Sequence, residues 1–144
     1  MPSISDSRRA ARIRAVQEHF RLENTHNLDA VMDTFGNQAS FLANNVLHEG
    51  RDAVRAFYGE FFHGFPDLRF EIIHLHVGDD AIPVELVLSG THTGTWFGVP
   101  PTGRRFELPA CAVFIFDEHD QIAGERGYFD SALMLRQLGL LPPS

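Results

Sequence analysis

The segment from Arg104 to Phe116 alternates between apolar and other residues over most of its length. Side chains of a strand point to opposite faces in turn, so this pattern predicts one long strand with a single apolar face. The members of that face are Phe106, Leu108, Ala110, Ala112, Phe114 and Phe116. A sheet that contains such a strand must bury this face against another layer of the chain.

The first half of the chain supplies helices for that layer. The range Arg8–Asn24 carries apolar residues at helical spacing and predicts an amphipathic helix. Asn27 is a plausible cap for a second, short helix, which Gly36 is expected to end. A third helix is predicted over Asp52–His63, and Pro66 prevents its continuation.

The second half is predicted to be mostly strand, and a final helix follows. Further strands are expected at Ala39–Leu47, Leu68–Val77, Ile82–Thr91 and from Gln121 on, and the last helix runs from Ser131 to Gly139. Within Leu68–Val77 the apolar residues change parity, which indicates a bulge or strong bend. Helices and strands are segregated, so the predicted class is α+β with a mainly antiparallel sheet. A sheet bent around the N-terminal helices makes a cone, whose open end leaves an apolar pocket.

Length and charge limit the function further. The 144 residues suit one domain, 1–144, of which Met1–Ser7 is expected to be frayed. The net charge of −7 argues against nucleic acid as a partner, and no apolar run is long enough for a membrane span. Without an apolar leader, the expected compartment is the cytoplasm. A single cysteine, Cys111, forms no intrachain disulfide.

The strongest candidates for chemistry lie in the last predicted strand. Arg126, Tyr128 and Asp130 are two residues apart and therefore share one face. Asp130 over an apolar pocket would have a raised pKa and could shuttle protons, while Arg126 could hold an oxyanion. The alternative is structural: an aspartate just before a helix is a strong N-cap, and the two roles are compatible.

The histidines offer a weaker signal. His74 and His76 share a strand face, and together with His48 or His92 they could bind a metal. No carboxylate or thiol accompanies them at a ligand-like spacing, so we expect no metal. One of these histidines could instead line the pocket as an acid or base.

Two glutamates lie within predicted strands. Glu85 is expected to face away from Val84 and Leu86, toward water. Glu125 has the opposite parity to Asp130 and is expected outside the pocket, at a subunit interface or paired with Arg104 or Arg105.

Trp96 and Phe97 occupy a loop bounded by glycines and prolines, and either form a lid over a ligand or cover the edge of the core. We predict a substrate-binding wall that includes this loop. Its members are His48, His74, Trp96, Phe97, Leu108, Ala112 and Phe114.

Several motifs resemble one known family over nearly the whole chain. They are Phe65-Pro66-Asp67-Leu68, Gly90-Thr91-His92-Thr93-Gly94, Pro100-Pro101-Thr102-Gly103-Arg104, and Tyr128-Phe129-Asp130 followed by Leu135-Arg136-Gln137-Leu138-Gly139. In this order they are similar to the SnoaL-like polyketide cyclases, or ester cyclases, of the nuclear transport factor two-like superfamily. The resemblance implies the cone-shaped fold and a cofactor-free intramolecular aldol condensation, with an aspartate as general acid/base at Asp130. Many relatives carry tryptophan where this chain has Arg126.

These observations lead to two functional hypotheses. The first is an enzyme that removes a proton next to a carbonyl of an apolar, polyketide-like substrate, through Asp130 with Arg126 or Tyr128 at the oxyanion. A keto-steroid-type isomerase would differ only in where the proton returns. The second is a binding module without turnover. The convex face of the sheet, with Val113 and Ile115, is expected to pair subunits into a homodimer or higher homo-oligomer.

Overall fold

The computed structural model describes residues 3–143 and consists of a six-stranded curved sheet with four helices. In chain order the elements are α1 (Asp6–Glu23), α2 (Leu28–Asp33), β1 (Phe35–Ala43), β2 (Val46–Glu49), α3 (Arg51–Gly64), β3 (Arg69–Leu75), β4 (Ala81–Thr91), β5 (Arg105–Phe116), β6 (Ile122–Phe129) and α4 (Ser131–Gln137). The strand order is β2-β1-β6-β5-β4-β3. No helix within this described range is long and apolar enough to cross a membrane.

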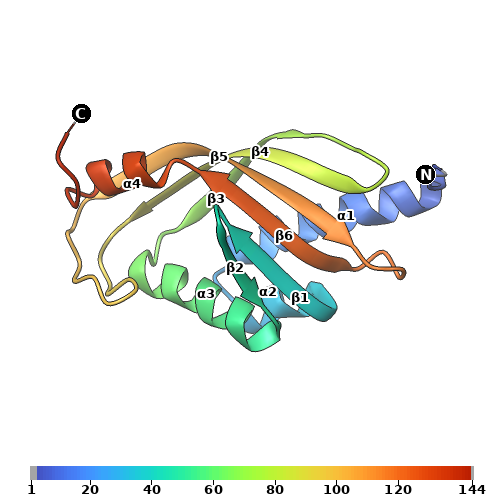
Figure 1. The fold of residues 1–144 in the computed structure, drawn as a ribbon, viewed down its shortest axis with the longest axis horizontal. Helices are drawn as coiled ribbons and strands as arrows, with labels where there is room; N and C mark the ends of the chain where they lie inside the picture. Colours follow the sequence, from blue (N-terminus) through green and yellow to red (C-terminus); the bar gives the residue numbers. More distant parts are fainter. Residues whose placement is uncertain (1–2, 144) are drawn as a thin grey trace.

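The sheet curves over the N-terminal helices, as the sequence predicts (Figure 1). α1 packs against β3, β4 and β6, and α3 packs against β1 and β2, so both lie on the concave side. Every strand pair is antiparallel except β1 with β6. The α+β cone is therefore confirmed, and its concave face is where an internal site can form.

Local predictions hold with shifted boundaries. The bulge predicted in the third strand is present as a register shift between Ile72 and His74. The strand predicted over Ala39–Leu47 is two strands, because Asn44 has a positive φ of 54° and starts a tight turn between them. Gly36 does not end α2; it lies inside β1, where a side chain would collide with that of Asp117.

The predicted face of β5 is the centre of the core. Phe106 and Phe114 are fully buried and Leu108 is nearly so. Phe114 packs edge-on against Phe20 of α1, with ring centroids 5.4 Å apart. The contact between the middle of the sheet and α1 thus fixes the distance between the two layers.

Phe114→Ala should cost about 3–5 kcal/mol of unfolding free energy, because it removes an aromatic ring between the layers and leaves a cavity. Urea denaturation of parent and variant measures it. The matched control is Leu47→Ala in β2, where the side chain is 57% exposed, with an expected change within about 0.5 kcal/mol. Equal losses in the two variants would contradict this account of the core.

The outer face of the sheet carries a shallow apolar hollow bordered by Ile73, Val87, Pro109, Cys111 and Tyr128. We expect two copies of the chain to pair through this face, as the sequence predicts for the convex side. Light scattering at micromolar concentration should give a dimer mass, and Val87→Arg should shift it to the monomer mass. A parent protein that is already monomeric would contradict the expectation.

Candidate functional site

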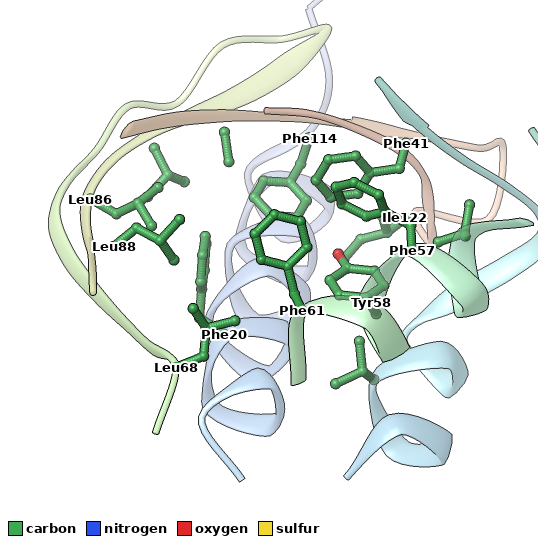
Figure 2. Close-up of a cluster of buried hydrophobic side chains, with 14 of the residues drawn as sticks. Phe20, Phe41, Phe57, Tyr58, Phe61, Leu68, Leu86, Leu88, Phe114 and Ile122 are labelled. Carbon is green, nitrogen blue, oxygen red and sulfur yellow. The ribbon is translucent and has the colours of Figure 1, made fainter. Parts of the chain in front are cut away.

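The concave side of the sheet encloses an apolar pocket between α1, α3 and strands β3 to β6. The cavity itself is small, about 60 Å³ in volume, and it is open to solvent on one side. Figure 2 shows several of its side chains converging from the helices and the sheet. The lining residues are mostly aromatic and aliphatic: Phe20, Phe41, Phe57, Phe61, Leu68, Phe70, Leu86, Leu88, Ala110, Ala112, Gly127 and Phe129.

A carboxyl group interrupts this apolar wall. Glu125 of β6 lines the pocket and is only 4% exposed. Its Oε2 lies 2.5 Å from the hydroxyl of Tyr58, which comes from α3 and is also buried. In Figure 2 the Tyr58 hydroxyl points inward among the aromatic rings. The sheet and α3 therefore bring an acid and a phenol together at one end of the pocket.

The hydrogen bonds of His19 continue this pair into a chain. The Thr34 hydroxyl donates to the carbonyl of Val31 at 2.6 Å, so its oxygen accepts from His19 Nδ1–H at 2.7 Å. Neutral His19 then has its lone pair on Nε2, which lies 3.2 Å from the Tyr58 hydroxyl. One hydrogen-bonded chain therefore joins Thr34, His19, Tyr58 and Glu125. Within it, the hydroxyl proton of Tyr58 can be donated either to His19 or to Glu125.

Glu23, one helical turn after His19 on α1, is the second buried carboxyl group of the site. It is 1% exposed and lines the pocket. Its Oε1 lies 3.1 Å from His19 Nε2, a contact that is an ion pair only if His19 is protonated. Within residues 3–143 neither oxygen of Glu23 has a hydrogen-bond partner. We therefore regard His19 as neutral and Glu23 as a group without a protein partner.

Burial dominates the electrostatics of this cluster. Desolvation lowers the pKa of His19, although Glu125 opposes that shift. Desolvation and the neighbouring Glu23 raise the pKa of Glu125 to about 8. Desolvation also raises the pKa of Glu23 well above its usual range, and that of Tyr58 likewise. Each direction favours the uncharged form, which is what an apolar pocket does to ionisable groups.

The same three side chains are where a metal ion could be held in the described part of the chain. Ligand atoms of His19, Glu23 and Glu125 lie within 4.8 Å of one another. The histidine set considered from the sequence does not assemble, because His74 and His76 are exposed and His76 pairs with Glu85 at 2.7 Å. Glu85 faces water, as predicted.

The structure corrects the premise behind the predicted catalytic face. Arg126, Tyr128 and Asp130 do share a face, and it is mainly the outer one. Arg126 and Asp130 are exposed, whereas Tyr128 is 43% exposed and lines both the pocket and the hollow on the outer face. The Asp130 side chain accepts from the backbone N–H of Leu133 at 2.9 Å and caps α4. The cap predicted for Asp130 is confirmed.

Glu125 faces inward, against our prediction, because it lies opposite Phe114 of the buried face of β5, whereas the prediction placed Asp130 on the pocket face. Opposite β5, Ile115 pairs with Gly124, whereas the next residue, Phe116, pairs with Ile122. Ala123 is thus the extra residue of a bulge, and a bulge reverses the face that later residues occupy. In a regular strand, every second residue after the buried Ile122 would face inward, which would include Arg126. Because of the bulge, Glu125 faces inward instead.

Most of the predicted substrate wall lies elsewhere. Ala112 lines the pocket. Leu108 and Phe114 are buried in the core behind it, and His74 is exposed on the outer face.

The remaining three members support the pocket from outside. His48 packs against Phe57, with ring centroids 4.5 Å apart and the rings tilted by 38°. Trp96 and Phe97 pack against Phe61, with centroids 5.5 Å and 6.0 Å away. They therefore back an aromatic side chain that lines the pocket.

Sequence reasoning missed His19, Glu23 and Tyr58. A usable signal was present on α1, where His19 and Glu23 fall three residues after the apolar Val16 and Phe20, on the same side of the helix. Polar residues within an apolar stripe either form a buried site or break the stripe. Tyr58 gave no such signal, because tyrosine is common on the apolar face of a helix.

The raised pKa of Glu125 gives a pH-dependent stability. Between about pH 4.5 and pH 8 the folded state keeps a proton on Glu125 that the unfolded state releases. The stability that the folded state gains from binding this proton is complete below that window. It is lost as the pH rises through the window. The unfolding free energy of the parent, measured with urea, should fall as the pH rises across this window. The fall should be smaller in Glu125→Gln, whose side chain cannot ionise. Parallel pH profiles would show that Glu125 titrates normally.

Comparisons with known proteins agree with this architecture. No curated protein matches the chain. A structure described as a candidate SnoaL-like polyketide cyclase from Jannaschia sp. CCS1 has a TM-score of 0.85 at 22% identity, over 99% of this chain and 100% of that one. AclR from Streptomyces galilaeus, described as a candidate hydroxylase, has a TM-score of 0.81 at 20% identity, over 94% and 85%.

A third structure is SalBIII, described as an epoxide hydrolase/cyclase-like enzyme in pyran ring formation of the polyether salinomycin. It has a TM-score of 0.72 at 23% identity, over 85% of this chain and 92% of that one. At such identities these structures establish the fold. The model of the SnoaL-like polyketide cyclase family matches residues 11–138, nearly the whole chain. The chain therefore belongs to the SnoaL-like polyketide cyclase family.

Proposed function

We propose that this protein is a cyclase-type enzyme that closes a ring in an apolar carbonyl compound by intramolecular aldol condensation, with Glu125 as general acid/base. One observation carries the assignment: a buried carboxyl group, hydrogen-bonded to Tyr58, lies in the wall of an otherwise apolar pocket. Family membership supports the cyclase type, and the reaction is our extension of it.

Each step can be assigned to side chains of the pocket. The Glu125 carboxylate takes a proton from the carbon next to a carbonyl, and the electron pair of that C–H bond becomes an enolate. The enolate carbon attacks a second carbonyl of the same molecule, forming the C–C bond and an alkoxide. Glu125 then returns its proton to the alkoxide. Tyr58 holds Glu125 in place through its hydrogen bond and links it to His19.

The apolar wall contributes to this chemistry in two ways. It binds the hydrocarbon part of the substrate through burial, since aromatic side chains from α1, α3 and β3 surround the space. It also makes Glu125 a stronger base than an exposed glutamate, because the desolvated carboxylate holds a proton more tightly. Asp130 is exposed and has neither advantage.

Glu125→Gln should slow proton abstraction by about a hundredfold or more, the usual contribution of a general acid/base. A ketone probe, 2-tetralone, allows the step to be measured without the natural substrate: NMR follows deuterium uptake at the carbon next to the carbonyl in heavy water. Glu85→Gln, an exposed glutamate on the outer face, is the matched control.

Asp130→Asn separates this assignment from the one implied by the family resemblance. It keeps the size and the capping ability of the side chain, so stability should change by about 1 kcal/mol or less. If Glu125 is the base, exchange in this variant stays near the parent rate. A loss of exchange in Asp130→Asn, together with normal exchange in Glu125→Gln, would restore the sequence-based prediction and refute ours.

A further inference from the structure

The proposed reaction leaves one buried group of the pocket unused. Glu23 lines the pocket, is 1% exposed, and has two oxygens without a hydrogen-bond partner in the described chain. A buried polar group without a partner is destabilising, because it has lost its hydrogen bonds to water. Such a group aimed into a ligand pocket is explained if the ligand supplies the missing partner.

The surroundings of Glu23 define what that partner can be. The groups facing it are His19 on its own helix, Tyr58 from α3 and Glu125 from β6, and none of them is a permanent cation. The other ionisable groups of the pocket wall are Cys111 and Tyr128. While Glu125 is protonated it can donate to the Tyr58 oxygen, and the Tyr58 hydroxyl then donates to His19 Nε2, the ring nitrogen 3.1 Å from Glu23. A carboxylate here would be an isolated buried charge, so the neutral acid is the favoured form.

We propose that Glu23, as a neutral carboxylic acid, donates a hydrogen bond to the carbonyl oxygen of the substrate. This proposal rests on the proposed function, because it places the carbonyl next to the carbon from which Glu125 takes a proton. It also defines the substrate class: an uncharged, apolar molecule with an oxygen acceptor at the end that contacts Glu23. An anionic ligand would meet two carboxyl groups, and a pure hydrocarbon would leave Glu23 unpartnered.

The two glutamates then have complementary roles in one step. As Glu125 takes the proton, the electron pair of the C–H bond moves toward the carbonyl oxygen, which becomes an enolate oxygen. The O–H of Glu23 stabilises the growing negative charge there, and its own proton stays bound to it. Two carboxyl groups with different environments, one a base and one a hydrogen-bond donor, are sufficient for enolisation.

Three probes with one carbon skeleton test the recognition directly. They are 2-tetralone, its hydrocarbon tetralin, and 2-aminotetralin, which is an ammonium ion at neutral pH. Calorimetry should show that the parent protein prefers the ketone. Infrared spectra should show the carbonyl stretch of bound 2-tetralone at lower frequency than in an apolar solvent, because it accepts a hydrogen bond.

Two substitutions distinguish Glu23 as a hydrogen-bond donor from Glu23 as a negative charge. Glu23→Gln keeps an N–H donor of the same size and should keep the infrared shift. Glu23→Met keeps the volume and removes the donor, so the shift should disappear and ketone affinity should fall about tenfold, while tetralin binding is unchanged. The spectrum of the parent protein is itself a test that does not depend on the folding of any variant.

Other outcomes would overturn the proposal. Tighter binding of the ammonium probe, lost in both variants, would make Glu23 a carboxylate for organic cations. A melting temperature raised by zinc in the parent, and not in Glu23→Gln, would make it a metal ligand with His19 and Glu125. An unshifted carbonyl stretch in the parent would also refute it. Glu125→Gln should keep the infrared shift while losing deuterium exchange, so a failure of the proposed function would be seen separately.

Discussion

The site depends on the burial of two carboxyl groups and a histidine between the concave sheet and α1. Taking a charge out of water is expensive, and here the protein offers no permanent cation to compensate for it. The uncharged forms of His19, Glu23 and Glu125 are the ones that this environment tolerates. The cluster therefore has to be explained by proton positions and hydrogen bonds rather than by ion pairs.

The fold brings these groups together from four elements. α1 crosses the concave face and carries His19 and Glu23 one turn apart, while the end of α2 provides Thr34, which fixes the proton of His19 on Nδ1. α3 provides Tyr58, and β6 provides Glu125. Phe114 and Phe20, packed between sheet and helix, keep the two layers at the spacing that these hydrogen bonds need.

The sequence predicted the fold better than the site. The alternation in β5 and the segregation of helices and strands were enough for the α+β cone, because burial of a long apolar face has few solutions. In β6 the same alternation correctly placed Arg126, Tyr128 and Asp130 on one face. It could not show which face is the pocket, because the bulge at Ala123 reverses the parity within the strand. Bulges depend on pairing with β5 and leave little trace in a sequence of this length.

The inward orientation of Glu125 and the outward orientation of Asp130 determine which of the two acids lies in the pocket. Asp130 is exposed at the start of α4, where its side-chain oxygen caps the helix. Glu125 ionises only near pH 8, so its carboxylate is a stronger base by several powers of ten than that of an ordinary glutamate. The same apolar wall that would bind the substrate thus raises the basicity of the group that attacks it. The unpartnered Glu23 fits the same scheme. When Glu125 takes a proton, the negative charge moves to the substrate, and in a pocket lined by no cation a hydrogen-bond donor such as Glu23 is needed to stabilise it.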